Sequence, residues 1–340
     1  MASIMQDPDS IFLQRCLTLA RLAGSKVQTN PLVGAVLVID DKIIGEGYHQ
    51  KSGEAHAEIN AIKSVRDHSL LKKATLYVSL EPCCTYGRTP PCTDAIIANQ
   101  IPRVVIGCLD PNPLVAGKGV ERLKKAGVSV TIADDTSAFE DINSVFFFNL
   151  ESKRPYITLK WAQSQDRYIA ALNQEGLPKP TKISAYPASI FTHRLRAENQ
   201  AILVGSNTAN IDNPSLNTRL YPGVSPQAIV LGREKDLNPQ LKLLQSSQSK
   251  LISAPKADQD LASWLTELYQ QKKIASILVE GGTNVLQQFI DQGLYEKIYR
   301  YRSPSTLGQG VASPVLEEAF PWSGNAQLGP DKLEWYQRPL

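Results

Sequence analysis

The sequence predicts an α/β protein with two domains, each combining buried strands with helices. Along the chain, short apolar runs rich in β-branched residues alternate with segments whose apolar residues recur at helical spacing. The 340 residues exceed the usual domain size of about 100–200 residues, which favours two domains. Apolar residues make up 42% of the chain, and this fraction is enough to form two cores.

The first elements follow from local patterns. Residues 11–23 carry apolar side chains at helical spacing and predict an amphipathic helix. Residues 32–40 and 42–49 are apolar and β-branched, and they meet at Asp40 and Asp41. This arrangement predicts a β-hairpin.

Helices and strands then alternate to the end of the first domain. Residues 55–68 place three apolar residues on one face of a helix, and residues 75–80 form a strand that Pro82 terminates. The remaining elements are a helix at 92–100, a strand at 103–108, a helix at 119–127 closed by Gly127, and a strand at 128–132. This alternation predicts a partly parallel sheet with helices on its faces.

A boundary is expected near residues 146–155, where an aromatic run passes into a charged stretch that contains proline. We therefore expect a first domain at 1–150 and a second domain at 151–340. Buried strands of the second domain are predicted at 156–162, 201–208, 228–232 and 276–282. Its clearest helices are predicted at 191–200 and 284–292.

Charge and hydropathy narrow the class of partner. The net charge is +3, from 36 basic and 33 acidic residues, and this balance argues against a strongly basic nucleic-acid surface. No apolar run approaches the ~20 residues that span a bilayer, and the polar N-terminus does not resemble a signal peptide. We expect a cytosolic protein with no membrane partner. A homo-oligomer is compatible with the sequence, which does not determine the oligomeric state.

The cysteine and histidine residues gather in the first third of the chain. All five cysteines and three of the four histidines lie there. An odd number of cysteines, three of them crowded into ten residues, is a poor disulfide framework and favours a metal cluster. Cys16 and Cys108 fall on core-like positions and are expected to pack in the interior.

One motif predicts the metal chemistry. His56 and Glu58 begin a helix, and Cys83, directly after a proline, is followed by Cys92. This order is typical of zinc deaminases, in which one His and two Cys bind Zn²⁺ and the Glu is not a ligand. We take Cys83 as the ligand and leave its neighbour Cys84 as a nearby thiol.

Three protein ligands leave a fourth tetrahedral position for water, as in catalytic zinc sites. The metal lowers the pKa of that water to about 7, and Glu58 is placed to move its protons. A purely structural zinc site is disfavoured, because only three convincing ligands are available and Glu58 would have no role.

The segment EPCCTYGRTPPCTDAII (81–97) separates the two thiols by eight residues. It resembles the deaminase domain of bifunctional riboflavin biosynthesis enzymes, in which a diaminohydroxyphosphoribosylaminopyrimidine deaminase is fused to a reductase. Matching segments are NPLVGAV (30–36), GEGYHQKSGEAHAE (45–58) and DPNPLVAGKG (110–119). The resemblance implies a cytidine-deaminase-like three-layer fold.

The resemblance also implies site residues in the first domain. His56, Cys83 and Cys92 match zinc ligands, and Glu58 matches the proton shuttle. Contacts with the base and ribose phosphate of the substrate are implied for Asn30, His49, Arg88 and Thr89. Without the motif, Asn30 would be interpreted as a turn residue and His49 as a surface residue at a strand end.

The second domain is similar to the reductase domain of the same family, which implies a dihydrofolate-reductase-like fold. The best matches are LRAENQAILVGSNTANIDNPSLNTR (195–219) and ILVEGGTNVLQQFI (277–290). The resemblance implies NADPH contacts at Thr208, Asp212, Gly281, Gly282 and Thr283. It implies substrate contacts at Arg196, Leu216, Arg219 and Glu280. On residue type alone, Arg196 would be a solvated helix charge.

The chain departs from the family pattern in three places. Cys84-Thr85 replaces Ser-His, Gln165–Tyr168 replaces Leu-Asp-Gly-Lys, and Lys182 replaces a Trp. Loss of the glycine at Arg167 removes the residue that tolerates a positive φ, so we expect a different loop path there.

We therefore expect zinc-dependent deamination of a phosphorylated pyrimidine, followed by NADPH-dependent reduction of its ribosyl chain to ribityl. The departures leave open a monofunctional deaminase whose second half is a scaffold. A nucleic-acid base deaminase is the other alternative.

Overall fold

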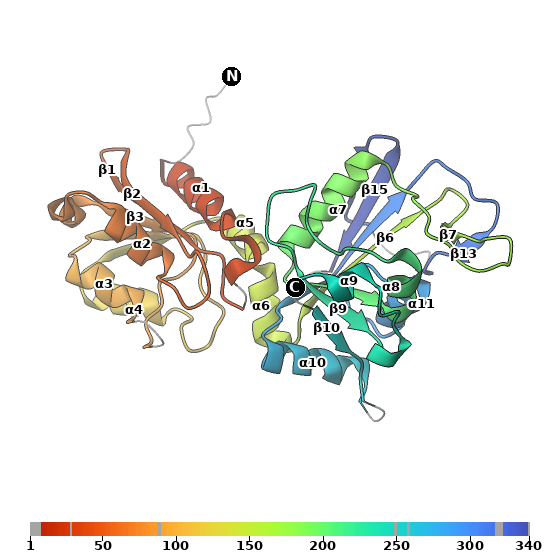
Figure 1. Cartoon of the computed structure of the whole chain (residues 1–340). Coiled ribbons are helices and arrows are strands. Elements are labelled where there is room, and N and C mark those ends of the chain that lie inside the picture. Colours follow the sequence, from red (N-terminus) through yellow and green to blue (C-terminus); the bar gives the residue numbers. More distant parts are fainter. Residues whose placement is uncertain are drawn as a thin grey trace, which may run out of the picture. The chain divides into compact units, whose positions relative to one another are not determined.

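The computed structural model describes residues 8–27, 29–86, 90–247, 250–256, 259–316 and 322–338. The chain divides into two compact units, Met1–Ser152 and Lys153–Leu340, coloured red to yellow and yellow-green to blue in Figure 1. Among the described residues, no helix is both long and apolar enough to cross a bilayer.

The described part of the first unit contains a five-stranded sheet in the order β2-β1-β3-β4-β5. Its strands are β1 (Gly34–Ile39), β2 (Lys42–Tyr48), β3 (Thr75–Val78), β4 (Arg103–Ile106) and β5 (Ser129–Ile132). β1 is antiparallel to β2 and β3, whereas β3, β4 and β5 are parallel. The predicted hairpin is confirmed, with Asp40 and Asp41 at φ 47° and 57° in its turn.

Helices cover both faces of this sheet. They are α1 (Pro8–Arg21), α2 (Ala57–Ser64), α3 (Cys92–Ala98), α4 (Lys118–Lys125), α5 (Ser137–Ile142) and α6 (Ser144–Ser152), with short 3₁₀ turns η1 (Gly24–Val27) and η2 (His68–Lys73). Alternate residues of β1 enter different cores: Leu37 packs with α2, α3 and α4, while Val36 packs with α1 and α5. The predicted three-layer fold is confirmed.

The described residues of the second unit form an eight-stranded sheet, in the order β10-β9-β8-β11-β6-β12-β15-β14. Its strands are β6 (Tyr156–Gln163), β8 (Ala201–Gly205), β9 (Gln227–Leu231), β10 (Lys250–Ser253), β11 (Ser276–Val279), β12 (Lys297–Arg302), β14 (Gly324–Leu328) and β15 (Asp331–Gln337). The strands from β10 to β12 in this order are parallel, and β15 is antiparallel to both neighbours. A separate ribbon pairs β7 (Tyr168–Ala171) with β13 (Gly310–Ala312).

Helices also cover both faces of the second sheet. They are α7 (Tyr186–Glu198), α8 (Ser206–Asp212), α9 (Lys242–Gln245), α10 (Leu261–Lys272) and α11 (Thr283–Asp291), with the 3₁₀ turn η3 (Glu234–Asp236). α10 and α11 pack on one core, and α7, α8 and α9 pack on the opposite side of the sheet. The predicted α/β fold is therefore confirmed in this unit as well.

Two strand predictions were too long at the same edge of this sheet. The strand expected at 201–208 ends at Gly205, where α8 begins, and the strand expected at 276–282 ends at Val279. Both ends lie at the carboxyl edge of neighbouring parallel strands, because β8 and β11 are paired. That edge is where ligands bind in open α/β sheets.

Arg167 stands where the family has a glycine, and we expected it not to adopt a positive φ. This expectation was wrong. Arg167 adopts φ 65° although it is not glycine. Neighbouring bonds hold the turn: the Asp166 carboxylate accepts from the backbone N–H groups of Leu307 and Gly308 at 3.0 and 2.7 Å. The Arg167 N–H donates to the Ser164 carbonyl at 3.1 Å. These bonds offset the cost of a left-handed conformation, roughly 1–2 kcal/mol.

Candidate functional site

The first unit brings one imidazole and two thiols together. His56 precedes the first turn of α2, Cys83 follows the end of β3, and Cys92 opens α3. The Nδ1 atom of His56 lies 3.5 Å from Cys83 Sγ and 3.3 Å from Cys92 Sγ. Their donor atoms all lie within 4.8 Å of one another, and no other such group of metal-ligating side chains occurs in the described ranges.

These distances fit a tetrahedral zinc ion. Zn–S bonds of about 2.3 Å and Zn–N bonds of about 2.0–2.1 Å place the sulfur and nitrogen atoms about 3.5 Å apart in that geometry. The backbone N–H of Cys92 also donates to Cys83 Sγ at 3.3 Å, which joins the two ligand segments. The three side chains therefore form a suitable donor set.

The two thiols are electrostatically unequal. A hydrogen bond from Cys92, together with the nearby His56, lowers the pKa of Cys83 to about 4. The interaction with Cys83, and then burial, raise the pKa of Cys92 above its ordinary value. Of the two thiols, Cys83 therefore loses its proton more readily to give the thiolate, the form that binds metals.

Glu58 lies in the first turn of α2, beside the donor set. Its side chain is only 3% exposed. Burial, followed by the negative charge of Cys83, raises the pKa of Glu58 to about 7. A carboxyl group with a pKa near neutrality can both accept and return a proton.

His49 and Asn30 form a polar pair next to the same site. His49 is 3% exposed, so its interpretation as a surface residue is wrong. Its Nδ1 lies 3.2 Å from the Ala55 carbonyl, and its Nε2 lies 3.0 Å from Asn30 Nδ2. Burial lowers the pKa of His49, so the neutral ring donates to Ala55 and accepts from Asn30.

The other sequence predictions for this unit have separate outcomes. Cys84 is not part of the donor group, while Cys16 and Cys108 are buried in the core as expected. Arg88 and Thr89 lie outside the described residues.

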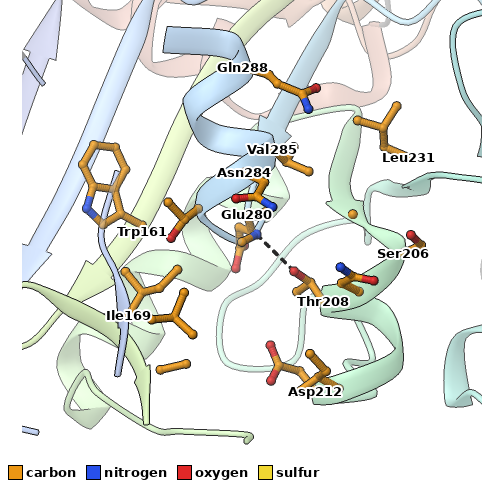
Figure 2. Close-up of a pocket in the computed structure, with 18 of the residues that line it drawn as sticks. Trp161, Ile169, Ser206, Thr208, Asp212, Leu231, Glu280, Asn284, Val285 and Gln288 are labelled. Carbon is orange, nitrogen blue, oxygen red and sulfur yellow. Dashed lines mark hydrogen bonds between the residues drawn. The ribbon is translucent and has the colours of Figure 1, made fainter. Parts of the chain in front are cut away.

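In the second unit, a cavity of about 950 Å³ lies at the carboxyl edge of the sheet (Figure 2). All five residues predicted to contact a cofactor line it: Thr208, Asp212, Gly281, Gly282 and Thr283. The N–H of Gly282 donates to Thr208 Oγ1 at 3.0 Å and connects the glycine turn to α8. A Cβ on Gly281 would lie 2.8 Å from Val285, so close packing on α11 requires glycine there.

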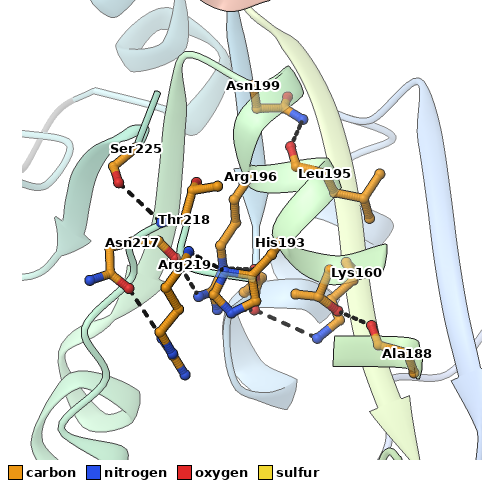
Figure 3. A network of polar contacts seen from close by, with 12 residues as sticks. Lys160, Ala188, His193, Leu195, Arg196, Asn199, Asn217, Thr218, Arg219 and Ser225 are labelled. Carbon is orange, nitrogen blue, oxygen red and sulfur yellow. Dashed lines mark hydrogen bonds and ion pairs between the residues drawn. The ribbon is translucent and has the colours of Figure 1, made fainter. Parts of the chain in front are cut away.

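A second cavity of about 440 Å³ contains a network of charged side chains (Figure 3). Glu280 binds Arg196 through two bonds of 2.8 and 3.0 Å, and the amine of Lys160 lies 3.6 Å from the same carboxylate. Arg196 is only 12% exposed, so its interpretation as a solvated helix charge is wrong. Burial opposes ionisation, but Arg196 and Lys160 outweigh it and hold the pKa of Glu280 at about 2.

Arg219 adds another cation to the lining of this cavity, and His193 adds a neutral imidazole. The N–H of Arg219 donates to His193 Nδ1 at 3.0 Å, so that nitrogen carries no proton. Burial, and then the charges of Arg196 and Arg219, lower the pKa of His193 to about 4. Leu216, also predicted to contact substrate, is buried with φ 50° and is absent from the described lining of both cavities.

Sequence reasoning missed Lys160, His193 and the position of Lys182. Lys160 is the one charged residue in the apolar segment YITLKWA (156–162), and a charge in a buried strand is itself a signal. His193 lies three residues before Arg196, on the same side of α7. Lys182, exposed, lines both cavities together with Lys160 and Glu280.

Comparison with known proteins gives matches to both units. Residues 6–108 match the family described as the cytidine and deoxycytidylate deaminase zinc-binding region, and residues 155–327 match the RibD C-terminal domain. The riboflavin biosynthesis protein RibD of Aquifex aeolicus is 37% identical over 328 residues, covering 91% of this chain and 90% of its own length. The RibD protein of Escherichia coli is 34% identical, covering 95% and 97%.

Two solved structures match nearly the whole chain. A diaminohydroxyphosphoribosylaminopyrimidine deaminase/5-amino-6-(5-phosphoribosylamino)uracil reductase from Thermotoga maritima is 30% identical, with a TM-score of 0.86 and coverage of 97% of this chain and 98% of that one. RibD from Acinetobacter baumannii is 31% identical, with a TM-score of 0.85 and coverage of 96% and 98%.

Proposed function

The chain belongs to the RibD family of bifunctional riboflavin biosynthesis enzymes, and from this premise we propose how its two units and their side chains divide the work. The enzyme is a deaminase and reductase that uses Zn²⁺ and NADPH. The first unit removes the exocyclic amine of a diaminopyrimidinone ribosyl phosphate as ammonia. The second unit then reduces the ribosyl group of the product to ribityl.

Zinc is bound by His56, Cys83 and Cys92. The support for this assignment is the donor set itself, whose separations of 3.3 and 3.5 Å fit tetrahedral bonds. When bound with three protein ligands, zinc supplies an acidified water as the nucleophile.

Glu58 moves the protons of the deamination. Its buried carboxylate accepts a proton from the attacking water and delivers it to the pyrimidine ring nitrogen. Glu58 then takes the proton of the new hydroxyl group and delivers it to the amine as the bond from carbon to nitrogen breaks, which leaves a carbonyl on the ring, so that water is consumed and ammonia is released. The pKa of about 7 supports both directions of transfer.

Asn30 and His49 bind and orient the pyrimidine. Their mutual hydrogen bond of 3.0 Å and the burial of His49 give a fixed polar wall beside His56, whose ring centroid lies 5.4 Å from that of His49. Arg88 and Thr89 bind the ribose phosphate, an assignment that rests on the matching motif, since a guanidinium suits phosphate oxygens.

NADPH occupies the larger cavity of the second unit. Gly281, Gly282 and Thr283 form the turn that opens α11, and backbone N–H groups at a helix start favour phosphate groups. Thr208 and Asp212 line the facing wall from α8. The cofactor supplies the hydride, while these residues position it.

The smaller cavity binds the sugar phosphate that is reduced. Arg196, Arg219 and Glu280 contact it, with Leu216 supporting the loop that carries Arg219. Lys160 joins this group, because Lys160 and Glu280 both line the two cavities. Hydride transfer is therefore expected where the two cavities share these side chains.

The partner is a small phosphorylated pyrimidine rather than a nucleic acid, in keeping with the net charge of +3. An odd number of cysteines, three of them crowded into ten residues, favours a metal site over disulfides and supports a reducing, cytosolic location.

The His/Cys/Cys donor set beside a buried Glu58 is the observation that carries the assignment. Mass spectrometry of the substrate, incubated with zinc-loaded enzyme with and without NADPH, tests both steps. We expect loss of the amine in both samples and addition of two hydrogens only with NADPH. A Glu58→Ala enzyme should lose ammonia release by at least about 100-fold and keep the reductase activity. Full ammonia release by that variant would contradict the assignment.

A further inference from the structure

A buried carboxylate outside the donor set binds an entire loop of the first unit. Glu81 follows β3 and is 4% exposed. Its Oε1 accepts from the N–H groups of Gly119 and Val120 at 2.9 and 3.1 Å. Its Oε2 accepts from Gly117 and Asp110 at 2.9 and 3.3 Å. One side chain therefore fixes both ends of the segment that leads into α4.

The local backbone is shaped to allow these contacts. A Cβ on Gly119 would lie 2.3 Å from the carbonyl oxygen of Pro82 and 3.0 Å from Glu81 Oε1. Gly117 has φ 75°, a conformation that side chains disfavour. The two glycines let α4 begin directly against the Glu81–Pro82 backbone, so the position of that helix depends on the carboxylate.

α4 in turn is attached to both thiol-bearing segments. The guanidinium of Arg122 donates to the carbonyl oxygen of Cys84 at 3.1 Å. It also forms an ion pair with Asp94, two residues after Cys92. The helix that Glu81 fixes thus links the backbone next to Cys83 with the first turn that carries Cys92.

We propose that Glu81 is a positioning residue of the metal site: through α4 and Arg122, it sets the separation of the Cys83 and Cys92 thiols. The inference rests on the proposed ligand set. Glu81 lies outside the donor set, and it acts by holding the segments that carry the ligands. Residues in this supporting role change metal affinity or activity by about 10–100-fold when mutated.

Glu81→Gln is the informative variant, because the amide keeps the shape but turns an NH₂ group toward two N–H donors. Asp9→Asn is the matched control in the same unit. Asp9 binds Arg103 at 2.5 and 3.1 Å and accepts from Tyr77 at 2.7 Å, and none of these residues is a predicted ligand. Both variants replace an acid by its amide, but only the first alters the linkage through α4.

The full-length proteins are stripped of metal and titrated with Co²⁺ in competition with a chromophoric chelator. We expect Glu81→Gln to weaken Co²⁺ binding by about 10–100-fold and to shift the thiolate-to-cobalt absorption bands, with Asp9→Asn close to wild type. The reductase activity of both variants should stay at the wild-type level.

Wild-type affinity and bands in a folded Glu81→Gln protein would overturn the positioning role, as would an equal loss in Asp9→Asn. If Glu81→Gln does not fold, Arg122→Met cuts the same linkage at a partly exposed side chain, and wild-type Co²⁺ binding there overturns the proposal. Absence of thiolate bands in the wild type would instead refute the ligand assignment, so the two failures are distinguishable.

Discussion

Glu280→Gln removes the negative charge from the buried network of the smaller cavity. In the wild type, Arg196 and Lys160 share this carboxylate, and all three side chains are between 11% and 13% exposed. The glutamine keeps the shape and one acceptor oxygen. It leaves two neighbouring cations without a counter-charge, directly where the two cavities meet.

The distances allow an estimate of the stability that Glu280→Gln loses. Opposite charges about 4 Å apart attract by about 4 kcal/mol at an effective dielectric constant of about 20, and Glu280 has two such partners. Desolvation offsets much of this attraction, so removing one partner of a buried pair costs about 3–5 kcal/mol. We expect about 3 kcal/mol for the isosteric change, which lowers the melting temperature of a domain of this size by about 6–12 °C.

The dependence of the free energy of unfolding on acid pH gives a second test of the same variant. The pKa of Glu280 is about 2, below its ordinary value of 4.5. The ionised form therefore stabilises the fold fully above pH 4.5, and this stabilisation is lost as the pH falls toward 2. Urea unfolding of Glu280→Gln should show a smaller decrease in stability over this range than the wild type.

Glu334→Gln is the control. Glu334 is also buried and binds Arg300 through bonds of 2.9 and 2.6 Å in the same unit, but it lines neither described cavity. Both variants should lose stability, whereas only Glu280→Gln should lose NADPH oxidation with the deaminated substrate. Wild-type melting and turnover in Glu280→Gln, or an equal loss of turnover in Glu334→Gln, would refute the catalytic placement of this network.

Further tests address the metal, the neutral imidazole and the altered cavity wall. Removal of zinc by a chelator should abolish ammonia release and spare NADPH oxidation with deaminated substrate, and loss of both activities in steady-state assays would count against separate sites. Because burial and the charges of Arg196 and Arg219 hold the pKa of His193 at about 4, below 6.5, the folded unit resists a proton that the unfolded chain accepts. Its stability to urea should therefore fall as the pH drops from 6.5 to 4, and His193→Gln should flatten this slope. Lys182→Trp should raise the KM of the phosphorylated substrate by about fivefold, since an exposed cation contributes about 1 kcal/mol, and should weaken the dependence of KM on salt. An unchanged KM and salt dependence would remove Lys182 from phosphate recognition.

The sequence predicted the parts of the fold that depend on local pattern. Apolar alternation and Asp40–Asp41 identified the hairpin, and the motif around His56 and Cys83 identified the donor set. The segments 201–208 and 276–282, each predicted as one strand, do not show in their sequence where strand pairing stops. Ser206 and Glu280 were therefore assigned to strands, although Ser206 begins α8 and Glu280 begins the turn before α11, and both line the larger cavity.

Contacts between distant residues could not be predicted from spacing. Arg196 and Glu280 are 84 residues apart and meet only because β8 and β11 are neighbours in the sheet. Lys160 was overlooked because its strand is otherwise apolar. The left-handed conformation of Arg167 could not be predicted for the same reason. The backbone N–H groups of Leu307 and Gly308, distant in the sequence, donate to Asp166 and help to stabilise this turn.

The donor set lies wholly before Ser152, and the described lining of both cavities lies wholly after Lys153. The residues proposed for deamination and those proposed for reduction therefore belong to different units of one chain. A chain disabled at Glu58 and a chain disabled at Glu280 would complement each other in a mixture. The delay before ribityl product forms in that mixture, compared with the intact enzyme, measures what the covalent linkage contributes to transfer of the intermediate.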